Sequence, residues 1–348
     1  MSTLTLLIPD FFTPLQSGQI PAAQLPDVSH LQCLLARAQG SREPLANFNS
    51  LLCQLLHVEP TAEGALPVAA LCYLADFNET EAGWYVRVDP VHLQLARDKL
   101  LLLDDHVLQT TPQEAAQLVA ELNQVYQEQG LRIRQGAAAR WYLHLTEDPR
   151  VQTHSLPEVL GRNIQAYLMK GEARQHWQSF MNEVQMLLHA SPVNAAREAD
   201  GRPAINSVWL WGEGSLEQLG QSAQAPLPMQ VYADDPLVRG LARFRGAEVH
   251  DMPDNATAWL MRAGAATDNL IVMNQPAIAA SHADTVQWLD FITHFNATWA
   301  PALMKALRDK TLTQLTIHDG NGRRYSLTPR LLVRWWKRKR PLPQIIAV

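Results

Sequence analysis

The first residue whose type and position could support chemistry is Asp10. It follows Pro9 and the short apolar run at residues 4–8, a pattern that predicts a buried strand with a carboxylate at its C-terminal end. In an open α/β sheet, ligands bind at the edge formed by the carboxyl ends of the strands. We therefore expect Asp10 either to bind a ligand at that edge or to cap a turn.

A second candidate lies in the run INSVWLWGEG at residues 205–214. This run lacks the lysine and the spacing of a phosphate-binding loop, and the third glycine of a dinucleotide-binding fingerprint is absent. We expect a central strand whose chain turns tightly at Gly212 and Gly214 as it leaves the sheet. Glu213, between the two glycines, is placed either to reach a ligand or to face solvent.

Three further candidates lie in patterns typical of helices. Ser50 is inside a helical pattern without a His or Lys base beside it, so packing is the alternative to a role as nucleophile. His282 and Asp284 come at the start of a long helical pattern, where they could form a cap and a first-turn charge or bind a metal.

Residues 89–106 also contain several residue types that bind metals. Alternation along the expected strand places His92 on a face with uncharged residues, and two of the aspartates precede a helix cap, so we expect no shared metal. The residues concerned are Asp89, His92, Asp98, Asp104, Asp105 and His106.

The elements that must position these residues follow from periodicity and turn signals. Helices are predicted at 31–38, 48–57, 111–130, 174–189, 236–244 and 284–307. Strands are predicted at 4–8, 131–134, 140–145, 205–214, 229–233, 247–250 and 270–273, with a hairpin across 91–104. Strands and helices alternate in the second half, which predicts a mainly parallel sheet.

Composition sets the class of protein. A chain of 348 residues is long enough for two domains or for one domain with a large insert, and 47% hydrophobic with 18% charged residues is an ordinary globular composition. We expect neither a signal peptide nor a membrane span. Three cysteines without CxxC spacing argue against a disulfide framework and a zinc site, so we expect a cytoplasmic protein.

The order of these segments resembles the archaeal-type cofactor-independent phosphoglycerate mutases, metalloenzymes of the alkaline phosphatase superfamily. LLIPD resembles their opening strand with its metal-ligand aspartate, FNSLLCQLLHVEP their nucleophile helix, and NSVWLWGEG their NSIWLWGQG strand. DPVHL, GRNIQ, NEVQMLLH, PVNAAREADG and RWWKRKRPL resemble the bacterial RpfE-type regulatory proteins.

The resemblance implies an alkaline phosphatase-like α/β fold with a mainly parallel sheet, helices on both faces and an inserted α+β cap domain. It places the first part of the core at 1–80, the cap at 81–199, the second part of the core at 200–322 and a basic, Trp-containing tail at 323–348.

These mutases hold two divalent metals with aspartates and histidines and attack phosphate with a serine. Carried over, Asp10 matches the first metal ligand, and His282 and Asp284 lie near the second metal motif. Only Ser50 could replace the nucleophile. The closing metal motif is reduced to the pair at 318–319. The resemblance thus implies a catalytically degenerate protein without a cofactor, and manganese or magnesium if the site is active.

A phosphoglycerate-like ligand would need cationic and amide donors. The alternative is that the same residues are ordinary surface arginines and capping asparagines. The resemblance points to Arg140, Arg162, Asn163, Asn194, Arg197 and Asn206, with Glu213 on the loop.

Charge is concentrated near the C-terminus. Eight basic and no acidic residues lie between Arg323 and Arg340, in a chain whose net charge is −5. With Trp335 and Trp336, residues 330–340 could bind a phosphorylated small molecule or an acidic protein. Alternatively the tryptophans pack on the body of the protein. The acidic excess elsewhere makes nucleic acid an unexpected partner.

Three functions therefore stay open. The first is a degenerate phosphoglycerate mutase-like pseudoenzyme that regulates by binding a ligand or partner. The second is an active metal-dependent mutase or phosphatase that interconverts 3-phosphoglycerate and 2-phosphoglycerate. The third is an interaction protein that works through the basic tail.

Overall fold

The computed structural model describes residues 2–44, 47–61, 65–219, 225–263, 267–334, 337 and 340–346. The chain forms two compact units: unit 1 comprises Met1–Val58 and Ala223–Val348, and unit 2 comprises Glu59–Ser222. Unit 2 is thus inserted into the sequence of unit 1. The sequence-based boundaries at 80/81 and 199/200 both lie inside unit 2, because α4 and β7 pack within it.

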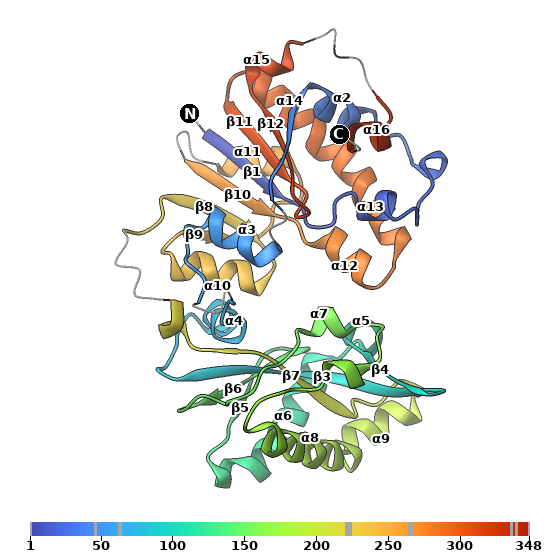
Figure 1. Cartoon of the computed structure of the whole chain (residues 1–348), viewed down its shortest axis with the longest axis vertical. Coiled ribbons are helices and arrows are strands. Elements are labelled where there is room, and N and C mark those ends of the chain that lie inside the picture. The colour runs from blue at the N-terminus through green and yellow to red at the C-terminus, as the bar shows by residue number, and fades with distance from the viewer. Residues whose placement is uncertain are drawn as a thin grey trace. The chain divides into compact units, whose positions relative to one another are not determined.

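Unit 1 is built on a seven-stranded sheet (Figure 1). The pairings that join β11, β1, β10, β8 and β9 are all parallel, while β12 and β2 extend the sheet in antiparallel fashion. In order across the sheet, the strands are β2 (Gln39–Arg42), β12 (Arg323–Leu327), β11 (Leu312–His318), β1 (Ser2–Leu7), β10 (Asp268–Val272), β8 (Met229–Ala233) and β9 (Glu248–His250). The predicted α/β class with a mainly parallel sheet is confirmed.

Helices pack on the sheet of unit 1. Leu4 and Leu6 of β1, with Leu315 and Ile317 of β11, alternate along their strands and are buried in one core with residues of α2, α11, α13 and α14. α10 packs against β8 and β9. The helices of unit 1 are α1 (Thr13–Gln16), α2 (Ser29–Arg37), α3 (Phe48–Leu55), α10 (Pro236–Phe244), α11 (Ala256–Arg262), α12 (Gln275–Ser281), α13 (Thr285–His294), α14 (Ala300–Arg308), α15 (Pro329–Leu332) and α16 (Leu342–Ile346).

The long helix expected at 284–307 is present but interrupted. Between α13 and α14 the residues Phe295–Trp299 form a π-helical turn. Pro301 has no N–H to donate to the preceding turn, which accounts for the break in the regular bonding pattern at this point. The Asn296 side chain in this turn accepts hydrogen bonds from the backbone N–H groups of His30 (2.9 Å) and Leu31 (3.0 Å) and so caps α2.

Unit 2 contains an antiparallel sheet with helices on both faces. The long strand β3 pairs with β4 and β6 along one edge and with β7 along the other, and β5 pairs with β6. Its strands are β3 (Trp84–Ala96), β4 (Lys99–Leu103), β5 (Ile133–Ala137), β6 (Arg140–Leu145) and β7 (Ser207–Gly214). Its helices are α4 (Val68–Phe77), α5 (Asp105–Leu108), α6 (Pro112–Tyr126), α7 (Leu156–Val159), α8 (Arg174–His189) and α9 (Pro192–Ala199).

The two faces of this sheet differ in chemistry. Val86 and Val88 of β3 point to a core shared with α6 and α8. Tyr85 of β3 and Tyr142 of β6 point to the other face, where both rings contact Tyr73 of α4. The predicted hairpin at 91–104 is confirmed as β3 and β4, and α6 begins with a capping box formed by Thr111 and Glu114.

Two expectations about placement were wrong. The run at 205–214 is not a strand of the parallel sheet, because β7 pairs antiparallel with β3 in unit 2. Residues 323–327 are not part of a separate tail, because β12 pairs with β11 and β2 in the sheet of unit 1. A continuous apolar run indicates only that both faces of a strand are buried. A strand in either of the two sheets would satisfy that pattern.

Over the described ranges, no helix is long and apolar enough to span a bilayer.

Candidate functional site at the carboxyl edge of the parallel sheet

Polar side chains gather where four neighbouring parallel strands of unit 1 end. Asp10 follows β1, Asp319 follows β11, Asn274 follows β10 and Asp235 follows β8. The loops are joined through the backbone, since the Ile8 N–H donates to the His318 carbonyl oxygen at 2.9 Å. This is the edge at which open α/β sheets bind ligands, so the position predicted for Asp10 is that of a binding site.

Asp10 is held by neighbours from two loops. Its backbone is left-handed (φ 57°), and its Oδ1 accepts hydrogen bonds from Thr13 Oγ1 at 2.7 Å and Asn321 Nδ2 at 3.1 Å. Asn321 Nδ2 also lies 3.0 Å from Thr13 Oγ1, so the three side chains form one cluster. The loop that carries Asn321 approaches closely because Gly320 (φ 74°) lies where a Cβ atom would be 2.9 Å from Pro9 Cα.

Asp319 accepts hydrogen bonds at both of its carboxylate oxygens. Its carboxylate is 1% exposed, and Oδ1 accepts hydrogen bonds from the backbone N–H groups of Asn321 (2.8 Å) and Arg323 (2.9 Å). Oδ2 accepts from Arg323 Nη1 at 3.2 Å, and Arg323 Nε donates to the Ile346 carbonyl oxygen at 2.9 Å. A charged guanidinium thus neutralises this buried carboxylate.

His318 lies beside Asp319 and is buried. Its Nδ1 is 3.6 Å from Glu43 Oε2, while Arg324 Nη1 is 3.3 Å from Glu43 Oε1. Burial lowers the pKa of the His318 imidazole, and Arg324 adds to this effect, although Glu43 and Asp319 oppose it. The neutral imidazole is therefore favoured at neutral pH.

The remaining two strands end in a paired amide and carboxylate. Asn274 Nδ2 donates to Asp235 Oδ2 at 2.6 Å, and Asp235 Oδ1 accepts from the backbone N–H groups of Leu237 (2.8 Å) and Val238 (3.2 Å). Asp235 is thus the N-cap of α10. Among the residues that the structure describes, no group of three or more His, Cys, Asp or Glu side chains is arranged to hold a metal ion.

The other candidate catalytic and metal residues have local partners. Ser50 lies in the first turn of α3, where its Oγ donates to Asn47 Oδ1 at 2.8 Å. Asp284 accepts from the Gln287 backbone N–H at 2.9 Å, which confirms its role as the cap of α13. His282 ends α12, and its Nδ1 lies 2.9 Å from the Ile278 carbonyl oxygen.

Two arginines predicted to bind a ligand in unit 2 form ion pairs instead of pointing to one pocket. Arg140 donates to both oxygens of Asp76, at 2.7 and 2.8 Å. Arg197 is 1% exposed and donates to Glu114 Oε2 at 3.0 Å and to two backbone carbonyl oxygens. The partners of the two guanidiniums are separate, so the structure does not bring these residues together.

The predicted amide and loop residues bind backbone and side-chain groups of unit 2. Asn194 bridges the Leu188 and Ile205 backbone, and Asn206 bonds both backbone groups of Leu93. Asn163 caps the short helix Ile164–Tyr167. Arg162 donates to the Tyr167 hydroxyl at 2.8 Å. The Glu213 carboxylate accepts from the Thr153 backbone N–H at 3.0 Å and from the Thr153 hydroxyl.

The glycines beside Glu213 have a structural explanation. A Cβ atom on Gly214 would lie 2.5 Å from Pro67 Cβ, and one on Gly212 would lie 3.1 Å from Val68 Cβ. Both glycines therefore permit the close approach of the start of α4 to β7.

A pocket in unit 1 is lined by basic residues of the C-terminal segment. This pocket of about 640 Å³ lies between α2, β2, β12 and α16, and Arg323, Lys337 and Arg340 line it together with Tyr325 and Ser41. Within the described ranges, its lining includes no acidic side chain. Trp335 and Trp336 lie outside the described residues. Sequence reasoning missed the partners Asn321 and Arg323, although both are in the GNGRR run directly after Asp319.

Part of the chain is similar to known proteins. Residues 67–194 match the family model described as 2,3-bisphosphoglycerate-independent phosphoglycerate mutase. A probable 2,3-bisphosphoglycerate-independent phosphoglycerate mutase of Geobacter sulfurreducens is 25% identical over 166 residues, or 47% of this chain and 41% of the relative. The mutase of Methanosarcina barkeri is 27% identical over 152 residues, or 42% of this chain and 38% of the relative.

The chain thus matches about two fifths of the length of these curated relatives. Among solved structures, the PH0037 protein from Pyrococcus horikoshii aligns with a TM-score of 0.53 at 11% identity, over 94% of this chain and 87% of that chain, which shows a shared fold. The segment matched by the family model lies entirely in unit 2, whereas the carboxyl-edge site lies in unit 1.

Proposed function

We propose that this protein is a phosphoglycerate mutase-like regulatory protein of the RpfE type that binds a ligand or partner without catalysis. The observation that carries this proposal is the set of donors at the carboxyl edge. Asp10 is held by Thr13 and Asn321, and Asp319 is held by Arg323 and two backbone N–H groups. A metal ion at Asp10 Oδ1 or at Asp319 would compete with donors that the chain itself supplies.

Electrostatics supports the same conclusion. A two-metal phosphotransfer site needs several anionic or imidazole ligands converging on ions about 4 Å apart. At this edge the positive charge beside Asp319 belongs to Arg323, whose guanidinium stays protonated at any physiological pH. It is fixed by the Ile346 carbonyl oxygen as well, so a metal would meet a cation already in place.

The ligand that suits unit 1 is an anion, held in the pocket lined by Arg323, Lys337 and Arg340. Guanidinium and ammonium groups are the usual partners of phosphate and carboxylate oxygens, and a small phosphorylated acid would bring several negative charges to Lys337 and Arg340, beside Arg323, which is already paired with Asp319. The same cations would serve an acidic protein partner, which is the alternative expected from residues 330–340. The cytoplasmic location expected from the sequence stays a prediction.

Catalysis is tested by incubating the purified full chain with 3-phosphoglycerate, with and without manganese, and measuring 2-phosphoglycerate. We expect no turnover from protein that circular dichroism shows to be folded. Manganese-dependent turnover that Asp10→Ala abolishes would overturn the non-catalytic assignment and establish the alternative, an active metal-dependent mutase.

Ligand binding is tested separately by calorimetric titration with 3-phosphoglycerate. The double variant Lys337→Glu/Arg340→Glu should weaken binding at least about tenfold, because it replaces two attractive contacts by repulsion. Lys305→Glu/Arg308→Glu on α14 is the matched control with the same change in net charge, outside the pocket lining. Equal loss in both variants would assign the effect to net charge. Absence of binding to the unaltered chain would favour an acidic protein partner.

A further inference from the structure

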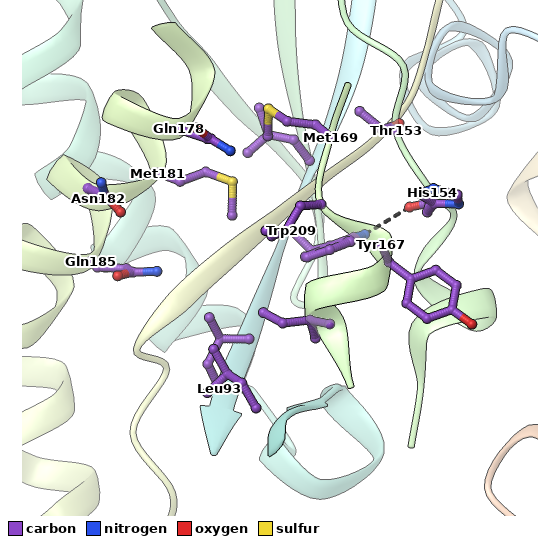
Figure 2. Close-up of a pocket in the computed structure, with 14 residues that line it drawn as sticks. Leu93, Thr153, His154, Tyr167, Met169, Gln178, Met181, Asn182, Gln185 and Trp209 are labelled. Atoms are coloured by element: carbon purple, nitrogen blue, oxygen red, sulfur yellow. Dashed lines mark hydrogen bonds between the residues drawn. The ribbon is translucent and has the colours of Figure 1, made fainter. Parts of the chain in front are cut away.

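A second pocket, in unit 2, differs in chemistry from the phosphoglycerate-type site that the resemblance implies. It has a volume of about 350 Å³ and lies between α8 on one side and residues 153–169 on the other, with β3, β4 and β7 contributing to its lining. Figure 2 shows Gln178, Asn182 and Gln185 on α8, separated by the hollow from His154 and Tyr167, with Trp209 between the two sides. Its size is that of a small-molecule site.

Most of the lining is apolar. Leu93 of β3, Met169, Met181 and Trp209 contribute hydrocarbon, sulfur and indole surface. The Trp209 indole is fixed, because it is 4% exposed and its Nε1 donates to the His154 carbonyl oxygen at 2.8 Å. A rigid aromatic ring beside two adaptable methionines is well suited to the apolar body of a ligand.

The polar part of the lining is a row of amides. Gln178, Asn182 and Gln185 recur at helical spacing on one face of α8, next to the face that Trp177, Phe180, Val184 and Leu188 bury in the core. Gln185 Nε2 donates to Ser207 Oγ at 3.1 Å, which leaves its carbonyl oxygen directed elsewhere. Each amide can donate and accept, so the row matches a ligand group that does both.

Charge is kept out of this pocket. No Lys, Arg, Asp or Glu is among the described residues that line it. The charged groups nearby face their own partners: Glu213 accepts from Thr153, Glu158 lies 3.4 Å from His154 Nδ1, and Arg162 donates to Tyr167. An ionised ligand would therefore lose its hydration without gaining an opposite charge.

From this geometry we infer that unit 2 binds an uncharged amphipathic small molecule, with its apolar body against Trp209, Met169 and Met181 and a carboxamide-like group against Gln178 and Asn182. The inference does not depend on the proposed function, because all the residues involved lie in unit 2.

The test uses the full chain and the neutral fluorescent probe phenylnaphthylamine, with octanamide and octanoate as competitors. We expect saturable binding of the probe, and displacement by octanamide at a concentration at least about tenfold lower than octanoate, which has the same chain but carries a charge. Absence of saturable binding, or equal competition by the two compounds, would overturn the inference.

Two sets of variants locate the binding. Met181→Trp fills the pocket and should weaken probe binding at least about tenfold, whereas Met186→Trp, on the exposed face of the same helix (74% exposed), should leave it unchanged. A probe that binds both variants equally well would lie elsewhere, and the inference would be wrong.

The second set keeps the inference testable if Met181→Trp does not fold. Gln178→Leu/Asn182→Leu should weaken octanamide at least about fivefold while probe binding stays within about twofold, because only the amide contacts are lost. Gln175→Leu, an exposed glutamine one turn earlier on α8, is the matched control. Unchanged octanamide affinity in the double variant would refute the assigned orientation.

Discussion

The buried ion pair between Arg87 and Asp89 gives the most direct test of the forces that hold unit 2 together. The side chains are 8% and 1% exposed, and Arg87 Nε and Nη2 donate to the two Asp89 oxygens at 2.9 and 2.6 Å. Trp211, opposite Arg87 in the β3–β7 pairing, donates from Nε1 to Asp89 Oδ2 at 2.7 Å. The guanidinium also lies over the Trp211 ring, 4.8 Å from its centroid.

Removing only the negative charge of Asp89 should lower the free energy of unfolding substantially. Asp89→Asn keeps the shape but leaves the Arg87 guanidinium buried without a counter-ion, which typically costs about 3–5 kcal/mol of unfolding free energy. The contact of the guanidinium with the Trp211 ring is present with and without the substitution, so it does not offset this loss. We therefore expect Asp89→Asn to destabilise unit 2 by about 3 kcal/mol.

Removing both charges should cost less than removing one. Arg87→Met/Asp89→Leu leaves no unpaired charge, and its main cost is the Trp211 N–H left without an acceptor, about 1–3 kcal/mol. We expect this double variant to be more stable than Asp89→Asn. Urea unfolding followed by circular dichroism measures the difference. Amide hydrogen exchange in the β3–β7 ladder assigns it to unit 2.

The result that would refute this reasoning is a double variant less stable than Asp89→Asn. In that case the pair would stabilise the sheet through its hydrogen bonds rather than through mutual neutralisation. A loss below about 1 kcal/mol in Asp89→Asn would instead mean that Arg87 finds water or another acceptor once the charge is removed.

Three further predictions concern single residues. Burial lowers the pKa of His318 below its ordinary value of about 6.5, so the unfolded chain binds the proton more readily than the folded chain. Thermal stability should therefore fall as the pH drops below about 6.5. The variant His318→Gln should flatten that fall between about pH 7 and 5. Glu114→Ala removes a capping-box partner and the carboxylate that pairs with buried Arg197, so urea unfolding should show a loss of about 3 kcal/mol, and a loss below 1 kcal/mol would contradict this role. Gly320→Ala should lower the free energy of unfolding by about 1–3 kcal/mol more than Gly18→Ala, because Gly18 has the same left-handed backbone but nothing near the position of the new methyl group. Equal losses of stability would mean that the contact with Pro9 relaxes without cost.

Local signals in the sequence predicted where helices and strands occur better than they predicted which sheet a strand belongs to. Residues 229–233 and 236–244 are a strand and a helix over the predicted ranges, because Asp235 and Pro236 mark the helix start chemically. The strand at 205–214 was also predicted, but its sheet was not. Its apolar side chains would be buried equally well beside β3 or in the parallel sheet, and sequence alone does not show which strand supplies the hydrogen bonds.

The sequence predicted the position of a site residue only where neighbouring residues in the chain fix that position. Asp10 lies at the end of β1 as expected, since a strand followed by Pro9 fixes that position. Its partner Asn321 is 311 positions away, and no spacing rule links the two. Arg197 was expected to bind a ligand, but a buried guanidinium is recognised only when its acceptor is known, and Glu114 is 83 positions away.

The family-model match and the candidate site lie in different units of the chain. The family model matches residues 67–194, inside unit 2, while Asp10, Asp319 and Arg323 belong to unit 1. Each unit buries its own core, and the two cores do not share residues. Clustered carboxylates repel one another, whereas Asp10 accepts hydrogen bonds from Thr13 and from Asn321 of the loop after β11, and Asp319 is paired with Arg323. Unit 1 thus supplies hydrogen-bond donors to Asp10 and a counter-charge to Asp319 from its own sequence, and these partners are the physical basis for proposing a binding role instead of a metal-dependent reaction.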